Sequence, residues 1–191
     1  MMHIVNSLKK RRTYYNIKKE LPVSIENVIE IVEEITELVP DAFNMKSSRL
    51  VIVHGEMQNK LWETIYNAFG GKVPREKIDG FLAGYGTILY FYDSRVVSDM
   101  QSKFPAYAAN FPVWANQASG MLQLAVWSGL RELEIGASLQ HYNPIIDKAV
   151  KELLNIPEEY VLIAEMPFGA IGEEPAQKDK EDIKKRVIVI S

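Results

Sequence analysis

Four consecutive basic residues, Lys9-Lys10-Arg11-Arg12, are followed directly by Thr13. Guanidinium groups bind phosphate oxygens through paired hydrogen bonds, and a hydroxyl can donate one more. This combination of cations and a hydroxyl suits a phosphate monoester. The alternative is a solvated basic segment with no ligand, because a charge run is often just a solvated surface. The residues alone leave both interpretations open.

A polar loop, residues 40–48, separates an expected helix from an expected strand and holds Asn44 and Lys46. A carboxamide both donates and accepts hydrogen bonds, so Asn44 could face a heterocycle with the same capacity. Alternatively, Asn44 could simply occupy a left-handed turn between the two elements, which asparagine tolerates. Neither interpretation is preferred on the residues alone.

A second polar segment, residues 138–144, holds Gln140 and His141 between a strand and a helix, where α/β arrangements often bind ligands. The alternative is that Asn143 merely caps the next helix. His141 is not expected to act as the base of a nucleophile, since no serine lies in a GxSxG turn.

Other kinds of catalytic site find no support in the sequence. There is no cysteine, which excludes disulfides, thiolate metal sites and cysteine nucleophiles. The three histidines are too scattered for a convincing zinc site. No P-loop, GxGxxG, HExxH or paired-carboxylate pattern is present. The residues therefore indicate an α+β domain with a candidate anion site.

The formal net charge is −3, yet both ends are basic and the middle is acidic. Residues 1–20 carry six bases and one acid, residues 178–191 carry five bases and three acids, and the rest has a net charge of −10. An acidic body argues against nucleic acid as a partner. Two basic ends suit a small anion instead.

The longest uncharged stretch, residues 104–130, is expected to contain a central helix from Trp114 onward. A solvated helix normally shows charge on its outer face, so we expect this one to be buried on all sides, in part by a second subunit. Polar residues and prolines interrupt the stretch, so it is not expected to cross a membrane. No secretory signal is recognisable, and we expect a cytoplasmic protein.

The spacing of apolar residues predicts a single α+β domain over residues 1–191, with four or five strands and about five or six helices. Helices are expected at 3–10, from the N-cap Ser24 to Pro40, and at 56–69, 93–103 and 144–154. Strands are expected at 49–54, 87–92, 136–140 (or an extended turn), 160–168 and 186–190. The segment between Gly71 and Gly84 is expected to be a loose loop.

Five segments occur in a recognisable order: Arg11-Arg12-Thr13-Tyr14-Tyr15, Pro40-x-Ala42-Phe43-Asn44-x-x-Ser47-Ser48-Arg49, Phe111-Pro112-Val113-Trp114, Gly136 to Asn143, and Met166-Pro167-Phe168-Gly169. Together they resemble the nitroreductase family of FMN flavoproteins, and in particular its short branch related to fungal fatty-acid-repression-mutant proteins. The resemblance implies a mostly antiparallel sheet flanked by helices, and a homodimer with a long central interface helix and two interfacial FMN sites. It also implies reduction of nitro compounds or quinones by NADH or NADPH through flavin N5.

The resemblance assigns roles to particular residues. Arg11, Arg12 and Thr13 match the motif that holds the phosphate and ribityl chain, and Asn44 matches the amide facing the ring near N5. Leu139, Gln140 and His141 fall where the family runs a loop past the flavin, and Lys178 and Arg186 match the C-terminal bases that close on the phosphate.

The sequence departs from the family pattern at Tyr15, where relatives usually have a cation near flavin N1 and O2. A phenol donates one neutral hydrogen bond, so either Lys46 or an N-terminal base substitutes, or the reduced flavin is less stabilised. This departure supports an alternative function, that of a flavin-binding regulatory or stress-response protein with little turnover.

Overall fold

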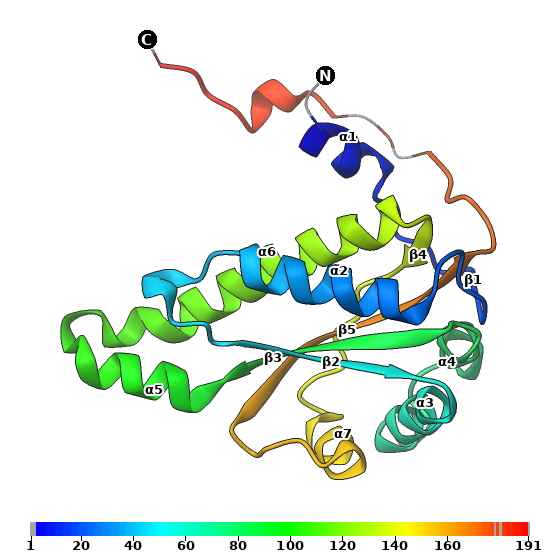
Figure 1. The fold of residues 1–191 in the computed structure, drawn as a ribbon, viewed down its shortest axis with the longest axis horizontal. Helices are drawn as coiled ribbons and strands as arrows, with labels where there is room; N and C mark the ends of the chain where they lie inside the picture. The colour runs from blue at the N-terminus through cyan, green and yellow to red at the C-terminus, as the bar shows by residue number, and fades with distance from the viewer. Residues whose placement is uncertain (1–2, 178, 180, 191) are drawn as a thin grey trace.

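The computed structural model describes residues 3–177, 179 and 181–190. Its centre is a five-stranded antiparallel sheet in the order β1-β5-β3-β2, with β4 also paired to β5 (Figure 1). The strands are β1 (Ile17–Lys18), β2 (Ser48–His54), β3 (Gly86–Asp93), β4 (Ile135–Ala137) and β5 (Tyr160–Ile171). The predicted α+β class and antiparallel sheet are confirmed.

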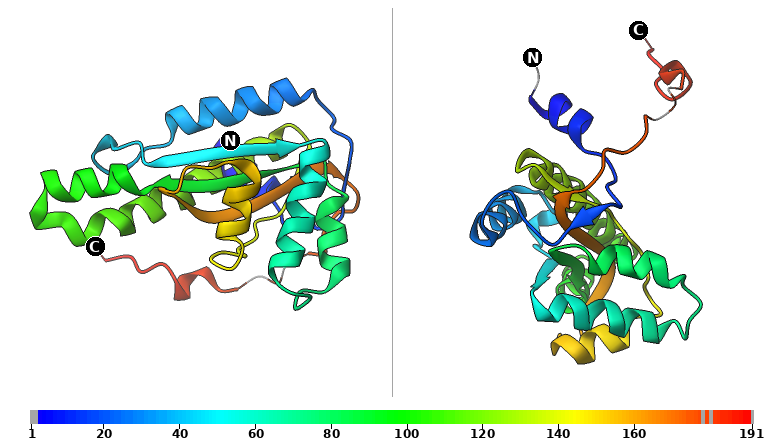
Figure 2. Two further views of the ribbon diagram at one scale, coloured as in Figure 1. Left: turned by 90° about the horizontal axis from the view of Figure 1, so that it is seen from below. Right: turned by 90° about the vertical axis from the view of Figure 1, so that its right-hand side faces the viewer.

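Helices cover both faces of this sheet. One face carries α2 (Ile25–Leu38) and α6 (Phe111–Glu132), and the other carries α3 (Glu56–Ala68), α4 (Arg75–Leu82) and α7 (Asp147–Leu154) (Figures 1 and 2). The remaining helices are α1 (His3–Lys10), which contacts α6, and α5 (Ser94–Lys103), which leads through a 3₁₀ segment (Pro105–Asn110) into α6. The predicted cap of α2 is present, since Ser24 Oγ accepts the Asn27 N–H at 3.2 Å.

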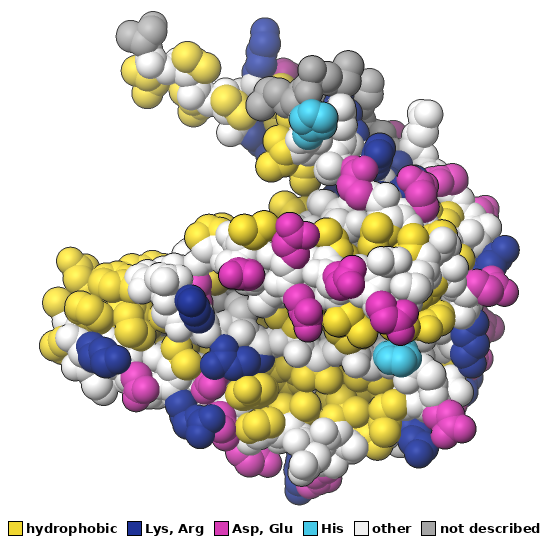
Figure 3. Space-filling view, in the orientation of Figure 1, with side chains coloured by type: hydrophobic (Ala, Val, Ile, Leu, Met, Phe, Trp, Pro, Cys, Tyr) yellow, Lys and Arg dark blue, Asp and Glu magenta, His cyan; other side chains and the backbone are white. Residues whose placement is uncertain are grey.

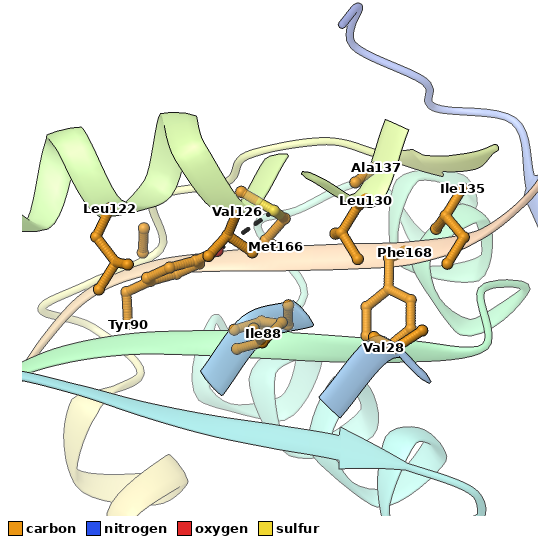
Figure 4. Close-up of a cluster of buried hydrophobic side chains, with 12 residues drawn as sticks. Val28, Ile88, Tyr90, Leu122, Val126, Leu130, Ile135, Ala137, Met166 and Phe168 are labelled. Carbon is orange, nitrogen blue, oxygen red and sulfur yellow. Dashed lines mark hydrogen bonds between the residues drawn. The ribbon is translucent and has the colours of Figure 1, made fainter. Parts of the chain in front are cut away.

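Alternation along the strands divides the core between the two faces. Ile88 and Tyr90 of β3 point toward α2 and α6, whereas Leu89 and Phe91 point toward α3 and α7. Figure 4 shows the apolar cluster between the sheet and the helices α2 and α6, which includes Val126 of α6. In this cluster the Tyr90 hydroxyl donates to Met166 Sδ at 3.5 Å. Two apolar layers therefore fix β5 and β3 rigidly at the centre of the molecule.

Two element predictions were wrong. The expected loose loop contains α4, whose residues Ile78 and Phe81 are three apart and buried against α3, while Gly80 weakens the local helix signal. Residues 186–190 form no strand. A β-prone segment needs a neighbouring strand to form hydrogen bonds with its backbone N–H and C=O groups, and no described strand is paired with this one. This segment extends away from the body of the molecule (Figure 2).

The central helix begins three residues earlier than expected, and it is not buried on all sides of the single chain. Val113, Met121 and Leu124 are 53%, 48% and 43% exposed along one uncharged face of α6. Within the residues that the structure describes, no helix is long and apolar enough to cross a membrane.

Candidate functional site

The basic motif lies directly after α1, against the C-terminal half of α6. The Arg11 guanidinium stacks 4.3 Å from the centre of the Trp127 ring, and the Tyr14 N–H donates to the Ala137 carbonyl of β4 at 3.0 Å. The same carbonyl accepts from Trp127 Nε1 at 3.1 Å. Strand β4 and α6 thus hold the motif at one end of the sheet.

Arg11 and Arg12 retain unused hydrogen-bonding capacity. Both Nε atoms are buried without a hydrogen-bond partner, and no carboxylate among the described residues pairs with either side chain. Burial, with a smaller contribution from neighbouring Arg12, lowers the pKa of Arg11. Two half-buried guanidinium groups without acid partners among the described residues have the chemistry that an anion site needs, and they are called the anion site below. Thr13 follows them, itself half-buried.

The segment after β5 runs beside this anion site. Arg12 Nη2 donates to the Ala176 carbonyl at 2.5 Å, and the Tyr14 hydroxyl donates to Glu174 Oε2 at 3.1 Å. Lys178 lies outside the described residues. Arg186 is exposed and pairs with Glu181. The C-terminal segment therefore reaches the site at Glu174 and Ala176, and the contact of Arg186 with a phosphate stays a prediction.

The segment 139–141 continues from β4 along the edge of β5. Gln140 is mostly buried and forms an isolated bridge to Glu165 of β5, whereas His141 is exposed. Tyr15 is exposed, and it lies close enough to Tyr142 to contribute to the raised pKa of that phenol. The basic motif, Tyr15 and the segment 139–141 are therefore grouped in one region, and their roles toward a flavin stay predictions.

Asn44 and Lys46 lie in a strained loop that one carboxylate anchors. Phe43, Asn44 and Lys46 have φ angles of 55°, 52° and 55°, which side-chain-bearing residues adopt at a cost. Asp41 Oδ2 accepts both the N–H and the hydroxyl of Ser47, at 2.8 and 2.7 Å. The loop is held in one conformation, with Asn44 and Lys46 exposed.

This loop and the basic motif lie at opposite ends of the sheet. The loop leads into Ser48 at one end of β2, whereas β4 pairs with the other end, where His54, Gly86 and Phe168 are neighbours. A strand of this length spans roughly 20 Å. One chain therefore does not bring Asn44 and Lys46 to Arg11, Arg12 and Gln140.

Three features of the region were not predicted from the sequence. Trp127 of α6 supports Arg11. Phe43 packs against Phe104, Tyr107 and Trp114 in a partly exposed aromatic cluster beside Asn44. Glu165 is completely buried, and the signal for it was a single acid within the apolar strand Val161–Phe168.

Comparisons with known proteins agree with this geometry. A sequence model of the Nitroreductase family matches residues 8–170. The Saccharomyces cerevisiae protein HBN1 is 34% identical over 188 residues, which cover 94% of this chain and 95% of HBN1. The nitroreductase FRM2 of the same yeast is 31% identical over 177 residues, 91% of each chain.

A solved structure matches the fold closely. The nitroreductase CinD from Lactococcus lactis, in complex with chloramphenicol, superposes with a TM-score of 0.94 at 41% identity, over 98% of this chain and 100% of that chain. CinD has also been solved with 4-nitrophenol and with nicotinic acid, at TM-scores of 0.93 and 0.92. These likenesses indicate an oxidoreductase, and the chain belongs to the nitroreductase family.

Proposed function

We propose that the protein is an FMN-dependent NAD(P)H oxidoreductase that reduces flat, electron-poor acceptors, nitroaromatic or quinone-like, by a ping-pong mechanism. The observation that carries the proposal is the anion site of Arg11 and Arg12, with two buried donors and no acid partner among the described residues. A phosphate monoester such as that of FMN fits this donor set. When bound, FMN supplies hydride transfer through N5, from nicotinamide and then to the acceptor.

The residues around the site have distinct tasks in this proposal. Arg11 and Arg12 neutralise the phosphate, and Thr13 donates a hydrogen bond to it or to the ribityl chain. Gln140 and His141 position the polar edge of the ring. The stack of Arg11 on Trp127 keeps that guanidinium oriented before the ligand arrives, which lowers the entropic cost of binding.

The relatives support the choice of substrates. CinD has been solved with chloramphenicol and 4-nitrophenol, both nitroaromatic, and with nicotinic acid, whose pyridine ring resembles that of nicotinamide. The exposed aromatic cluster around Phe43 offers a surface suited to a flat acceptor, because offset ring stacking favours electron-poor partners.

A homodimer completes the site in this proposal. Asn44 and Lys46 cannot reach the basic motif of their own chain, so the loop of a second copy supplies them there. The uncharged, exposed face of α6 gives such a dimer an apolar contact surface.

The C-terminal arm, residues 183–190, gives the dimer a second contact. Its residues 187–190 are apolar and 58 to 92% exposed, while β2 leaves one edge of the sheet unpaired. Beside that edge lies a cavity of about 540 Å³ between α2, β2 and α6, with Glu33 and Glu37 at its rim. Acidic side chains along α2 (Figure 3) complement the basic residues Lys184 to Arg186 of a partner's arm.

The second candidate is a flavin-binding regulatory protein with little turnover, which the exposed phenol of Tyr15 favours. Lys46, one of the two substitutes expected for the cation that relatives have there, lies at the far end of the sheet in the single chain. A neutral donor stabilises negative charge on a reduced ring less than a cation does.

Anaerobic stopped-flow absorbance tests the proposal against this alternative. The FMN-loaded protein is mixed with NADH or NADPH, and then with 4-nitrophenol or a quinone. The proposal predicts that the flavin band bleaches with the donor and returns with the acceptor. A flavin band that neither donor bleaches would favour the regulatory protein, and Tyr15→Lys would then be expected to restore bleaching.

A further inference from the structure

Glu165 is a completely buried acid at the centre of the sheet to which the proposed chemistry gives no role. Its backbone exchanges two hydrogen bonds with Gln140, at N to O distances of 2.7 and 3.0 Å. Its Oε2 accepts the Tyr142 N–H at 3.1 Å. Three hydrogen bonds therefore attach the segment 140–142 to this one residue, on either side of His141.

The other carboxyl oxygen of Glu165 is an unsatisfied polar atom. Glu165 Oε1, Tyr142 OH, Asn143 Oδ1 and Asp147 Oδ1 are all buried without a hydrogen-bond partner in the part of the chain that the structure describes. Tyr142 and Asp147 are close enough to interact electrostatically with Glu165. A proton on Glu165 removes a buried charge that no described cation pairs with.

The groups around Glu165 explain why the neutral form is favoured in the fold. Burial raises the pKa of Glu165 to about 8, with a further contribution from Asp147, although the Tyr142 N–H acts in the opposite direction. The strands and α3 present neutral side chains to this region, including Leu89 and Trp62. The titratable or charged groups of this region include Tyr142 and Tyr15, His141 of the attached segment, Asp147 with Lys151 on α7, and Lys77 of α4 over the Tyr142 ring.

We propose that Glu165 is a positioning residue: its protonated form holds the segment 140–142 in the shape that receives the flavin, and loss of the proton weakens FMN binding. The proposal rests on the proposed function, because it takes this segment as a flavin contact. Ionised Glu165 would place an unpaired negative charge directly beneath a segment that receives an anionic cofactor.

Two measurements on the full-length protein test the proposal. In the FMN-free protein, the ¹⁵N-labelled amide of Tyr142 should titrate with the ionisation of Glu165, and it should not titrate in E165Q. The Kd for FMN, measured by quenching of flavin fluorescence, should rise about tenfold between about pH 6.5 and 9. A tenfold change corresponds to about one unit of difference between the pKa of Glu165 in the FMN-free and the FMN-bound protein. In E165Q the Kd should stay within about twofold, because the amide mimics the neutral acid.

Two variants serve as controls. E165L cannot accept the Tyr142 N–H, so it should bind FMN more weakly than E165Q at every pH. E158Q alters a carboxylate that is exposed at the surface. In this variant the Tyr142 amide and the Kd for FMN should depend on pH as they do in the unmodified protein.

An equal pH dependence in the unmodified protein and E165Q would overturn the proposal, and so would a Tyr142 amide that does not titrate. Failure of the unmodified protein to bind FMN at any pH would instead refute the proposed function. In that case the amide titration would still decide whether Glu165 holds the segment.

Discussion

At the scale of single residues, the site is defined by polar atoms without partners. The Nε atoms of Arg11 and Arg12 are buried donors, and Glu165 Oε1 and Asp147 Oδ1 are buried oxygens. Native proteins rarely leave such atoms unsatisfied without a functional reason. The two arginine donors belong to the segment 11–15, and Glu165 is bonded to the segment 139–141 through Gln140, which supports the ligand site proposed there.

Arg12→Ala should weaken FMN binding. A charge-assisted hydrogen bond to phosphate contributes about 1.5–3 kcal/mol, so the Kd should rise roughly ten- to hundredfold. Isothermal titration with FMN measures the change. Arg95→Ala is the matched control, since Arg95 is a surface residue of α5 paired with Glu159. An unchanged Kd for Arg12→Ala would remove this residue from the phosphate site.

Glu165 also predicts how stability depends on pH. Its pKa is about 8 in the fold and near 4.5 in an unfolded chain. Between these values the folded state binds the extra proton, so stability falls as the pH rises from about 4.5 to 8. In urea unfolding, the free energy of unfolding should fall by on the order of a few kcal/mol over this pH range, and it should fall by less in E165Q. A stability curve identical in both proteins would contradict the assignment.

At the scale of elements, the sheet positions the site and also divides it. Strand β5 carries Glu165 and binds β4, and β4 in turn binds Tyr14 beside the basic motif. Strand β2 carries the loop of Asn44 away to the opposite end. The same sheet that fixes one half of the site therefore separates it from the other half.

Asp41→Ala tests how the Asn44 loop is held. The change removes an acceptor of two hydrogen bonds from Ser47, so the loop should lose its left-handed conformation, and stability should fall by about 1–3 kcal/mol. Hydrogen exchange of the Ser47 amide should become faster. Asp41→Asn, which keeps one acceptor oxygen, should show a smaller effect. Unaltered exchange in Asp41→Ala would show that other contacts hold the loop.

The sequence predicted most elements because their signals are local. Ser24 caps α2 as expected, and residues 87–92 of β3 all have strong β-propensity. It did not predict α4, because Gly80 lowers helix propensity and the burial of Phe81 against α3 is a tertiary effect. The strand predicted at 186–190 depends on a pairing partner, and no local pattern specifies one.

The candidate site was predictable to a similar extent. Tyr14, which follows Arg11, Arg12 and Thr13, binds Ala137 shortly before residues 139–141, and their common role at a flavin stays a prediction. The role of Glu165 could not be predicted, because its burial follows from the packing of α3 and α7 on the sheet. The distance between Asn44 and the basic motif depends on strand register, which the sequence pattern alone does not determine.

At the scale of the whole molecule, three features are exposed in the single chain: the uncharged face of α6, the unpaired edge of β2 and the apolar arm, residues 187–190. Apolar surface and an unpaired strand edge are costly to leave in water. In the proposed dimer a second copy of the chain covers all three features and brings a second Asn44 loop to the anion site.

Deletion of residues 183–191 tests this assembly. The unmodified protein should elute with a mass near twice 21.8 kDa by light scattering. The shortened chain should dissociate at protein concentrations at which the unmodified protein remains a dimer, since it loses the contact with β2. Its circular dichroism should be unchanged, because the arm adds no packing to the described core. A dimer of equal strength without the arm would exclude this contact.

The central claim is that the site binds FMN, and the absorbance spectrum of the purified protein tests it most directly. After incubation with excess FMN and gel filtration, the account predicts a yellow protein with about one flavin per chain, and a weaker flavin band for Arg12→Ala. A protein that stays colourless after this treatment would contradict the account.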